Sequence, residues 1–163
     1  MRLSGGSLAL TASAGAATAV QSIVAPSFVV ETTIETPRLK GGAWAGLAIY
    51  GDGVNYLALV SDGRTIQVRT QRRGERRVVA EVAAAAGTKV PLRIACVDGS
   101  RFRFAVQNRA DVWEEVAGET DGNFLPPWDR GVRAGVVVFG ESGAEGAFAY
   151  FSSTPDDGKL FAR

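Results

Sequence analysis

Residues 55–71 read NYLALVSDGRTIQVRTQ, and this stretch is the most informative about the fold. Two runs in which apolar residues alternate with other residues flank Asp62-Gly63, which predicts a β-hairpin with a two-residue turn that pairs Ser61 with Arg64. That pairing places four apolar side chains on one face: Leu57, Leu59, Ile66 and Val68. The opposite face then carries Tyr56, Ala58, Val60, Gln67, Arg69 and Gln71. The sequence therefore predicts an antiparallel hairpin with one face in a core.

The same alternation continues on both sides of this hairpin. Further strands are predicted at 28–35, 43–50, 77–82, 90–97, 101–108, 132–139 and 146–152, with glycine-rich turns between them. Pro26 and Pro37 flank the first of these runs, and we interpret them as marks of an edge strand. Short strands separated by regular turns predict an all-β sandwich or barrel.

A second hairpin is predicted around Asp98-Gly99-Ser100. A three-residue loop is needed here, because only that length places the apolar residues of both flanking runs on one face. These residues are Leu92, Ile94, Cys96, Phe102, Phe104 and Val106. Cys96 is thus predicted to be a small buried apolar residue and not a nucleophile.

Composition excludes several classes of function. The 163 residues include 18 basic and 17 acidic side chains, so the net charge of +1 predicts neither nucleic acid nor a membrane as a partner. Because there is no histidine, Ser-His-Asp and Cys-His nucleophile systems and histidine-based zinc sites are excluded. Cys96 is the single cysteine, which excludes an internal disulfide. The length and the 46% hydrophobic content predict one globular domain.

The N-terminal segment resembles a secretion signal only superficially. Gly5, Gly6 and Gly15 interrupt the apolar run that such a signal requires, and no window approaches the ~20 apolar residues of a membrane-spanning helix. Alternation around Leu8, and again around Val20, predicts instead a short pair of strands that closes a sheet.

Several segments together resemble a known superfamily. They are AGLAIYGD at 45–52, NYLAL at 55–59, Asp62-Gly63, PLRI at 91–94, DGSRFRF at 98–104 and Val112-Trp113. The chain resembles the concanavalin A-like lectin/glucanase superfamily and, more narrowly, the laminin-G-like jelly-roll domains found as C-terminal or accessory modules of β-xylosidase-type glycoside hydrolases. The resemblance implies an all-β, two-sheet antiparallel jelly-roll sandwich over residues 1–155, with a C-terminal tail at 156–163.

The resemblance also implies a function. We expect a non-catalytic, carbohydrate-associated accessory or carbohydrate-binding module, with carbohydrate or an adjacent glycosidase domain as its partner. A structural domain that packs on a catalytic partner is an alternative. The location is left open, and it would be periplasmic or extracellular if the chain belongs to a secreted glycosidase.

A sugar site needs an aromatic plate surrounded by rigid polar groups. Tyr56, Gln67, Arg69 and Gln71 share a predicted face and are the candidate binding residues of a concave groove. Trp128, in the proline-braced segment 125–129, is a candidate rim residue. In the alternative interpretation Tyr56 belongs to the core with its hydroxyl satisfied, and Trp128 folds back to cap that core. Trp44 and Trp113 are predicted to be core residues.

A second alternative is an enzyme. Glucanases of the superfamily use two glutamates four residues apart with an aspartate between them, and Glu31 and Glu35 have this spacing. Thr33 stands in the place of the aspartate, so a solvated strand face is the preferred interpretation, and no catalytic residue is predicted.

Five arginines surround Gly74-Glu75, at positions 69, 72, 73, 76 and 77. They are consistent with an anion-binding or nucleic-acid patch, or with a hairpin tip whose charge blocks edge pairing. No aromatic residue interleaves with them, which disfavours nucleic acid. Aspartates in the turns lack the spacing of a calcium loop, so no metal or cofactor is predicted.

Overall fold

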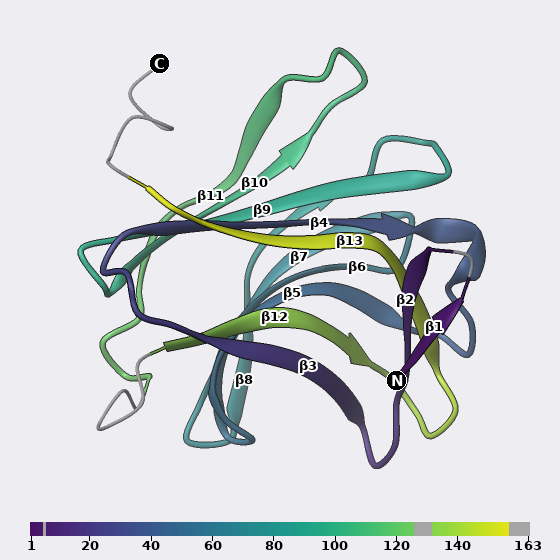
Figure 1. Ribbon diagram of the computed structural model, residues 1–163, viewed down its shortest axis with the longest axis horizontal. Coiled ribbons are helices and arrows are strands. Elements are labelled where there is room, and N and C mark those ends of the chain that lie inside the picture. Colours follow the sequence, from purple (N-terminus) through teal and green to yellow (C-terminus); the bar gives the residue numbers. More distant parts are fainter. Residues whose placement is uncertain (5, 126–131, 157–163) are drawn as a thin grey trace.

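The computed structural model describes residues 1–4, 6–125 and 132–156, and these form two antiparallel sheets (Figure 1). The seven-stranded sheet has the order β1 (Arg2–Ser4), β2 (Ser7–Thr11), β13 (Glu145–Pro155), β4 (Phe28–Glu35), β9 (Lys89–Val97), β10 (Arg101–Gln107) and β11 (Trp113–Asp121). The six-stranded sheet has the order β3 (Ala16–Ile23), β12 (Val132–Phe139), β5 (Trp44–Asp52), β6 (Asn55–Ser61), β7 (Thr65–Arg72) and β8 (Glu75–Ala83). A short 3-10 helix, η1 (Thr36–Arg38), follows β4. The predicted jelly-roll sandwich is confirmed.

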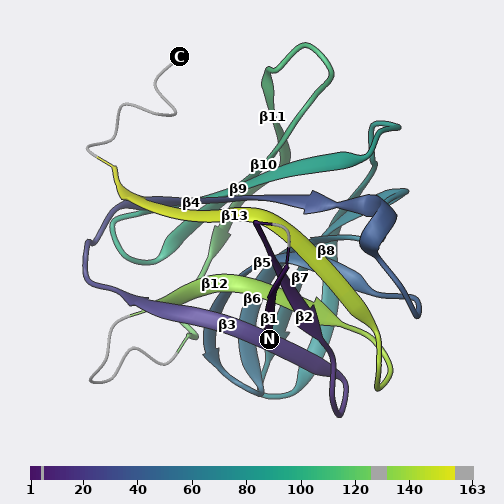
Figure 2. The same cartoon turned by 45° about the vertical axis from the view of Figure 1, so that its right-hand side comes forward.

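The core lies between the two sheets and is built from alternate residues of each strand. Leu57, Leu59, Ile66 and Val68 are all fully buried in it, so the predicted faces of the first hairpin are confirmed. Figure 2 shows the long strand β13 beside β4, above the layer that contains β3 and β12. The predicted tail at 156–163 lies, except for Asp156, outside the described residues.

The predicted register of the first hairpin is wrong by two residues. Ser61 pairs with Ile66, not with Arg64, so four residues, 62–65, separate the last paired positions of β6 and β7. Asp62 organises this loop, because its Oδ1 accepts hydrogen bonds from the backbone N–H groups of Arg64 and Thr65, both at 2.8 Å. A shift of two residues keeps every side chain on its predicted face, which is why the faces are correct although the turn is not.

The second hairpin has the predicted three-residue loop, with Val97 paired to Arg101. The interpretation of 28–35 as an edge strand is wrong, because β4 lies between β13 and β9. Pro26 and Pro37 are both outside β4, so neither removes a donor from its hydrogen-bonded ladder.

The two N-terminal strands do not pair with each other as predicted. β2 pairs with β13, whereas β3 pairs with β12 in the other sheet. The β2–β3 and β12–β13 connections cross from one sheet to the other side by side, joined by backbone hydrogen bonds from Ala12 N–H to the Ala144 carbonyl and from Gly140 N–H to the Gly15 carbonyl. Each sheet therefore takes one strand from each connection.

Two glycines allow the strands of the six-stranded sheet to approach closely. A Cβ atom at Gly46 would lie 2.0 Å from the Leu59 carbonyl oxygen, and one at Gly135 would lie 2.0 Å from the Ala19 carbonyl oxygen. In Figure 1, β12 and β5 arch toward the other sheet, so the six-stranded sheet is curved and its outer face is on the inner side of the curve. We call this outer face the concave face.

Candidate functional site

The concave face carries the predicted binding residues that the structure describes. Tyr56 extends from β6, and Gln67, Arg69 and Gln71 extend from β7, all on the face opposite the core. Trp128 lies outside the described residues. The face also receives residues from β5, β8 and β12 that the sequence did not single out for this site: Trp44, Tyr50, Arg76, Glu81, Arg133 and Phe139.

On one part of the concave face, four side chains contact one another in a row, from Trp44 through Arg69 and Gln67 to Glu81. The Arg69 guanidinium lies 4.1 Å from the centroid of the Trp44 ring. Arg69 Nε donates a hydrogen bond of 2.7 Å to Gln67 Oε1, and Gln67 Nε2 donates one of 2.5 Å to Glu81 Oε2. Arg69 is only 9% exposed, and burial lowers its pKa, with Arg76 acting in the same direction. These contacts hold the cation in one position.

Tyr56 is not an open platform for a ligand. It is 3% exposed, and its ring stacks on Phe139 with the centroids 5.2 Å apart. Its hydroxyl is buried and has no hydrogen-bond partner of ordinary geometry among the described residues, so the alternative of a satisfied hydroxyl finds no support there. Burial raises the pKa of Tyr56, partly offset by Arg76. The ring belongs to a second apolar cluster, on this face of the sheet, with Ala48, Ala58, Val60 and Val137.

Gln71 and Arg133 occupy the end of the face near the β5–β6 turn. Gln71 is 7% exposed, and its Nε2 donates a hydrogen bond of 3.0 Å to the Gly53 carbonyl. Arg133 lies over the Tyr50 ring at 5.2 Å and donates to the Gly51 carbonyl. Of the predicted binding residues described, only Gln67 is partly exposed.

Trp44 and Trp113 were predicted to be core residues, and both predictions are wrong. Each ring is only partly buried and lies on the outside of its sheet. Trp113 is on the seven-stranded sheet, where the Arg93 guanidinium lies 3.9 Å from its centroid. The two tryptophans thus make the same type of cation–π contact on opposite faces of the sandwich.

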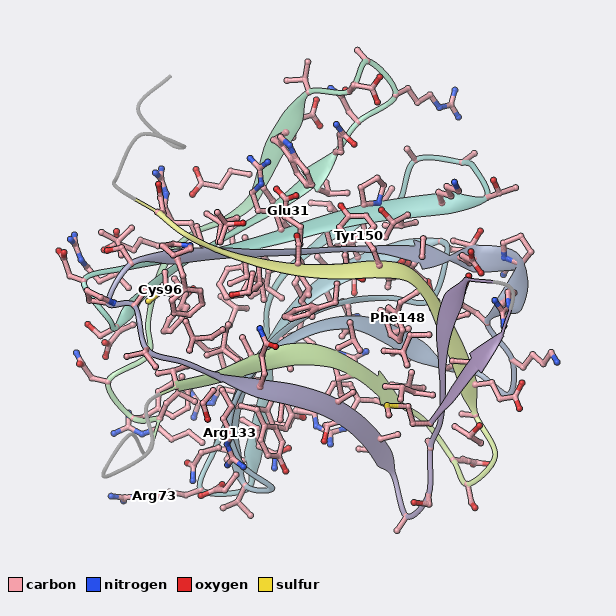
Figure 3. All side chains as sticks on the ribbon, viewed as in Figure 1. Glu31, Arg73, Cys96, Arg133, Phe148 and Tyr150 are labelled. Atoms are coloured by element: carbon pink, nitrogen blue, oxygen red, sulfur yellow. The ribbon has the colours of Figure 1, made fainter. Side chains whose placement is uncertain are left out.

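Glu31 and Glu35 have different hydrogen-bond partners. Glu31 Oε1 accepts a hydrogen bond of 2.6 Å from Arg93 Nε, and it lies on the outer side of the seven-stranded sheet (Figure 3). Glu35 has separate partners, since it accepts hydrogen bonds from Ser7 Oγ at 2.8 Å and Arg38 Nη1 at 2.9 Å. These hydrogen bonds lower the pKa of Glu35, whereas the general acid of a glycosidase needs a raised pKa.

The five arginines near Gly74 separate into two groups. Arg69 and Arg76 face the concave side, whereas Arg72, Arg73 and Arg77 line a hollow of about 580 Å³ at one end of the sandwich. Its other lining residues are Thr70, Glu75, Asp121 and Phe124, and we call this site the arginine hollow. Sequence reasoning missed it, because Asp121 and Phe124 come from a segment far from the hairpin tip.

Cys96 is fully buried, as predicted, and its thiol lies 3.7 Å from the Pro26 carbonyl. Burial raises the pKa of Cys96 to about 11 from an ordinary value of 9.0. An unfolded chain loses this proton near pH 9, whereas the folded chain keeps it until about pH 11. The contribution of this thiol to the free energy of unfolding is therefore fully present below pH 9, and it is lost as the pH rises toward 11.

We expect the free energy of unfolding to fall by roughly 2 kcal/mol across this interval. Denaturant titrations of the wild type and of Cys96→Ala at several pH values between 8 and 11 measure the effect. The variant is less stable but has a smaller slope with pH, and the difference between the two curves cancels the contribution of the tyrosines. Equal slopes would contradict the prediction.

In the part of the chain that the structure describes, no three acidic or cysteine side chains cluster in a way that could hold a metal ion. The same part contains no helix of the length and apolar character needed to span a membrane.

Several solved structures are similar to this chain in fold. No curated protein matches the chain. The GH43 BlXynB protein of Bacillus licheniformis has 22% identity and a TM-score of 0.72 over 86% of this chain. A bifunctional GH43-CE protein of Bacteroides eggerthii has 17% identity and a TM-score of 0.76 over 94% of this chain. The chain spans only 30% and 23% of these two proteins. Carbohydrate binding module CBM66 of Bacillus subtilis is similar in fold over 88% of this chain and 84% of its own length, with 16% identity and a TM-score of 0.54.

A family model extends over nearly the whole chain. It is described as the beta xylosidase C-terminal concanavalin A-like domain and matches residues 1–154. The fold, the two curved sheets and this match agree with the resemblance noted in the sequence, and the chain belongs to this family of beta xylosidase C-terminal concanavalin A-like domains.

Proposed function

We propose that this chain is a non-catalytic carbohydrate-binding domain and that the sugar contacts the concave face around Trp44. Family membership supports an association with glycoside hydrolases, and the likeness in fold to a carbohydrate binding module supports binding by a sandwich of this type. One of the two alternatives, a hydrolase using Glu31 and Glu35, is disfavoured, because each carboxylate is held by its own arginine.

The chain of contacts from Trp44 to Glu81 is the observation that carries this proposal. A pyranose needs an aromatic surface for its C–H groups and fixed donors and acceptors for its hydroxyls, because a desolvated hydroxyl without a partner costs ~1–3 kcal/mol. Trp44 supplies a partly exposed ring. Gln67 supplies an amide held by Arg69, and Glu81 supplies a carboxylate held by Gln67. Little side-chain entropy is then lost on binding.

Tyr56, Arg69 and Gln71 take a different part in this proposal from the one expected of them. Because they are almost completely buried, they support the face and do not touch the sugar directly. Direct contact is assigned to Trp44, Gln67 and Glu81.

The proposal predicts that Trp44→Ala weakens binding to xylan about tenfold or more, because the aromatic surface is lost. Native gels cast with increasing xylan concentrations measure the retention of each protein. Trp113→Ala is the matched control, since it removes the same side chain and the same type of arginine contact from the opposite sheet.

Retention of Trp113→Ala should equal that of the wild type, and melting curves establish that both variants fold. If xylan retained Trp44→Ala as strongly as the wild type, the assignment of the sugar site to the concave face around Trp44 would be wrong. If the wild type were not retained by xylan or by other plant polysaccharides, the proposal would fail in favour of a structural domain that packs on a catalytic partner.

A further inference from the structure

We propose that the arginine hollow binds the carboxylate of a uronic acid, that is, a pyranose whose C6 is oxidised to a carboxylate. This inference rests on the proposed function, because it takes the ligand to be a saccharide. It adds a second site at the end of the sandwich, separate from the concave face around Trp44.

The hollow is formed by the ends of three strands and by the segment that follows the third. Arg72 ends β7, Glu75 and Arg77 begin β8, and Asp121 and Phe124 lie at and beyond the end of β11. Its volume of about 580 Å³ is within the usual range for small-molecule sites.

The positions of two arginines are unusual. Along β7 the core-facing positions hold Ile66, Val68 and then Thr70 and Arg72, so the row that is apolar in the core becomes cationic at the opening between the sheets. Arg77 is paired with Glu75 at 2.7 Å, but among the described residues neither Arg72 nor Arg73 has a carboxylate partner. Both of these guanidinium groups belong to side chains that line the hollow.

The hairpin tip that carries these arginines is anchored. The backbone N–H of Arg73 donates to Asn55 Oδ1 at 2.9 Å, and the N–H of Gly74 donates to the Val54 carbonyl at 2.9 Å. Both bonds join the β7–β8 tip to the β5–β6 tip. The Cα positions of Arg72 and Arg73 are thereby fixed, which reduces the entropy lost when a ligand binds.

The chemistry of the lining fits an acidic sugar better than a simple anion. Guanidinium groups bind carboxylates with two parallel hydrogen bonds, and Phe124 offers an aromatic face to the C–H groups of a pyranose. The Arg72 guanidinium lies 5.8 Å from the Phe124 centroid, compared with 4.1 Å for Arg69 and Trp44, so it does not stack closely on the ring. Thr70, Glu75 and Asp121 supply acceptors for hydroxyl groups.

Titration of the whole chain with D-glucuronate and D-glucose tests the site. These ligands differ at C6, and the side-chain Nε–Hε signals of the arginines report binding by NMR. We expect saturable shifts with glucuronate, and an affinity at least tenfold lower for glucose and for inorganic phosphate. Equal affinities for glucuronate and phosphate, or no saturable shift with glucuronate, would overturn the proposal.

A double variant, Arg72→Gln with Arg73→Gln, should weaken glucuronate binding about tenfold or more. The control is Arg64→Gln with Arg109→Gln, which removes the same charge from exposed positions outside the hollow. Equal losses in the two double variants would attribute binding to overall charge and overturn the site.

Trp44→Ala separates this inference from the proposed function. It should leave glucuronate binding unchanged while it weakens retention by xylan. Loss of glucuronate binding in Trp44→Ala would refute a separate site in the hollow. If a single-stranded oligonucleotide bound through Arg72 and Arg73 and glucuronate did not, the assignment to a sugar would be wrong.

Discussion

Replacement of Gly46 by alanine is expected to lower the free energy of unfolding by about 3 kcal/mol, at the upper end of the cost of overpacking. The added Cβ would lie 2.0 Å from the Leu59 carbonyl oxygen and 2.8 Å from the Val60 Cα. Both are backbone atoms of β6, which is hydrogen-bonded to β5 on one side and to β7 on the other, so they cannot move away cheaply. Differential scanning calorimetry should show a decrease in Tm of roughly 6–12 °C for a chain of this size.

Gly118→Ala is the matched control for this experiment. Gly118 is also within a strand, β11, but a Cβ there would meet no atom within 4 Å. We expect its Tm to stay within about 2 °C of the wild type or to rise slightly, because alanine restricts the unfolded chain. Equal melting temperatures for the Gly46 and Gly118 variants would mean that the close approach of β5 and β6 is not required.

Replacement of Phe148 by alanine should cost about 3–5 kcal/mol, because it leaves a cavity in the middle of the core. Phe148 is fully buried, and in β13 it is aligned with Leu8 of β2 and Ile34 of β4. Figure 3 shows it between the two layers. Chemical denaturation monitored by tryptophan fluorescence measures the loss as a lower midpoint with an unchanged slope.

Tyr150 provides the comparison within the same strand. It is 42% exposed, and the register of β13 shifts between Phe148 and Phe151, which places Tyr150 at an irregularity facing solvent. Tyr150→Ala should therefore cost less than about 1 kcal/mol. If the two variants lost similar stability, the position of Phe148 in the core would be contradicted.

Much of the fold could be predicted from sequence, because alternation with a period of two reports directly which face of a strand is buried. The faces around Leu57 and Ile66 are correct for this reason. The turn at Asp62 is not, because an Asp-Gly pair favours a tight turn but also suits a longer loop in which the aspartate caps two backbone N–H groups.

The candidate site could be predicted only in part. Alternation assigns Tyr56 to the outer face, but it does not reveal that small residues beside it, such as Ala48 and Ala58, leave space into which the ring packs against Phe139. The same limit explains why Trp44 and Trp113 were assigned to the core. Large aromatic residues indicate burial, yet an arginine can cover a ring on the outside of a sheet.

Contacts between residues that are distant in the sequence could not be predicted from the alternation pattern. The interaction of Glu31 with Arg93 joins strands 62 residues apart, and the arginine hollow joins the β7–β8 hairpin to Phe124. Such contacts depend on the order of the strands in the sheets. The spacing of residues along one strand carries no information about that order.

The side-by-side crossing of the β2–β3 and β12–β13 connections has a consequence for biosynthesis. Leu8 is aligned with Phe148 and Val20 with Gly135, so neither sheet can be completed until β12 and β13, which follow β2 and β3 by most of this domain, have been synthesised. Nascent β2 and β3 therefore emerge with unpaired edges, which remain accessible to chaperones and proteases until β12 and β13 are available.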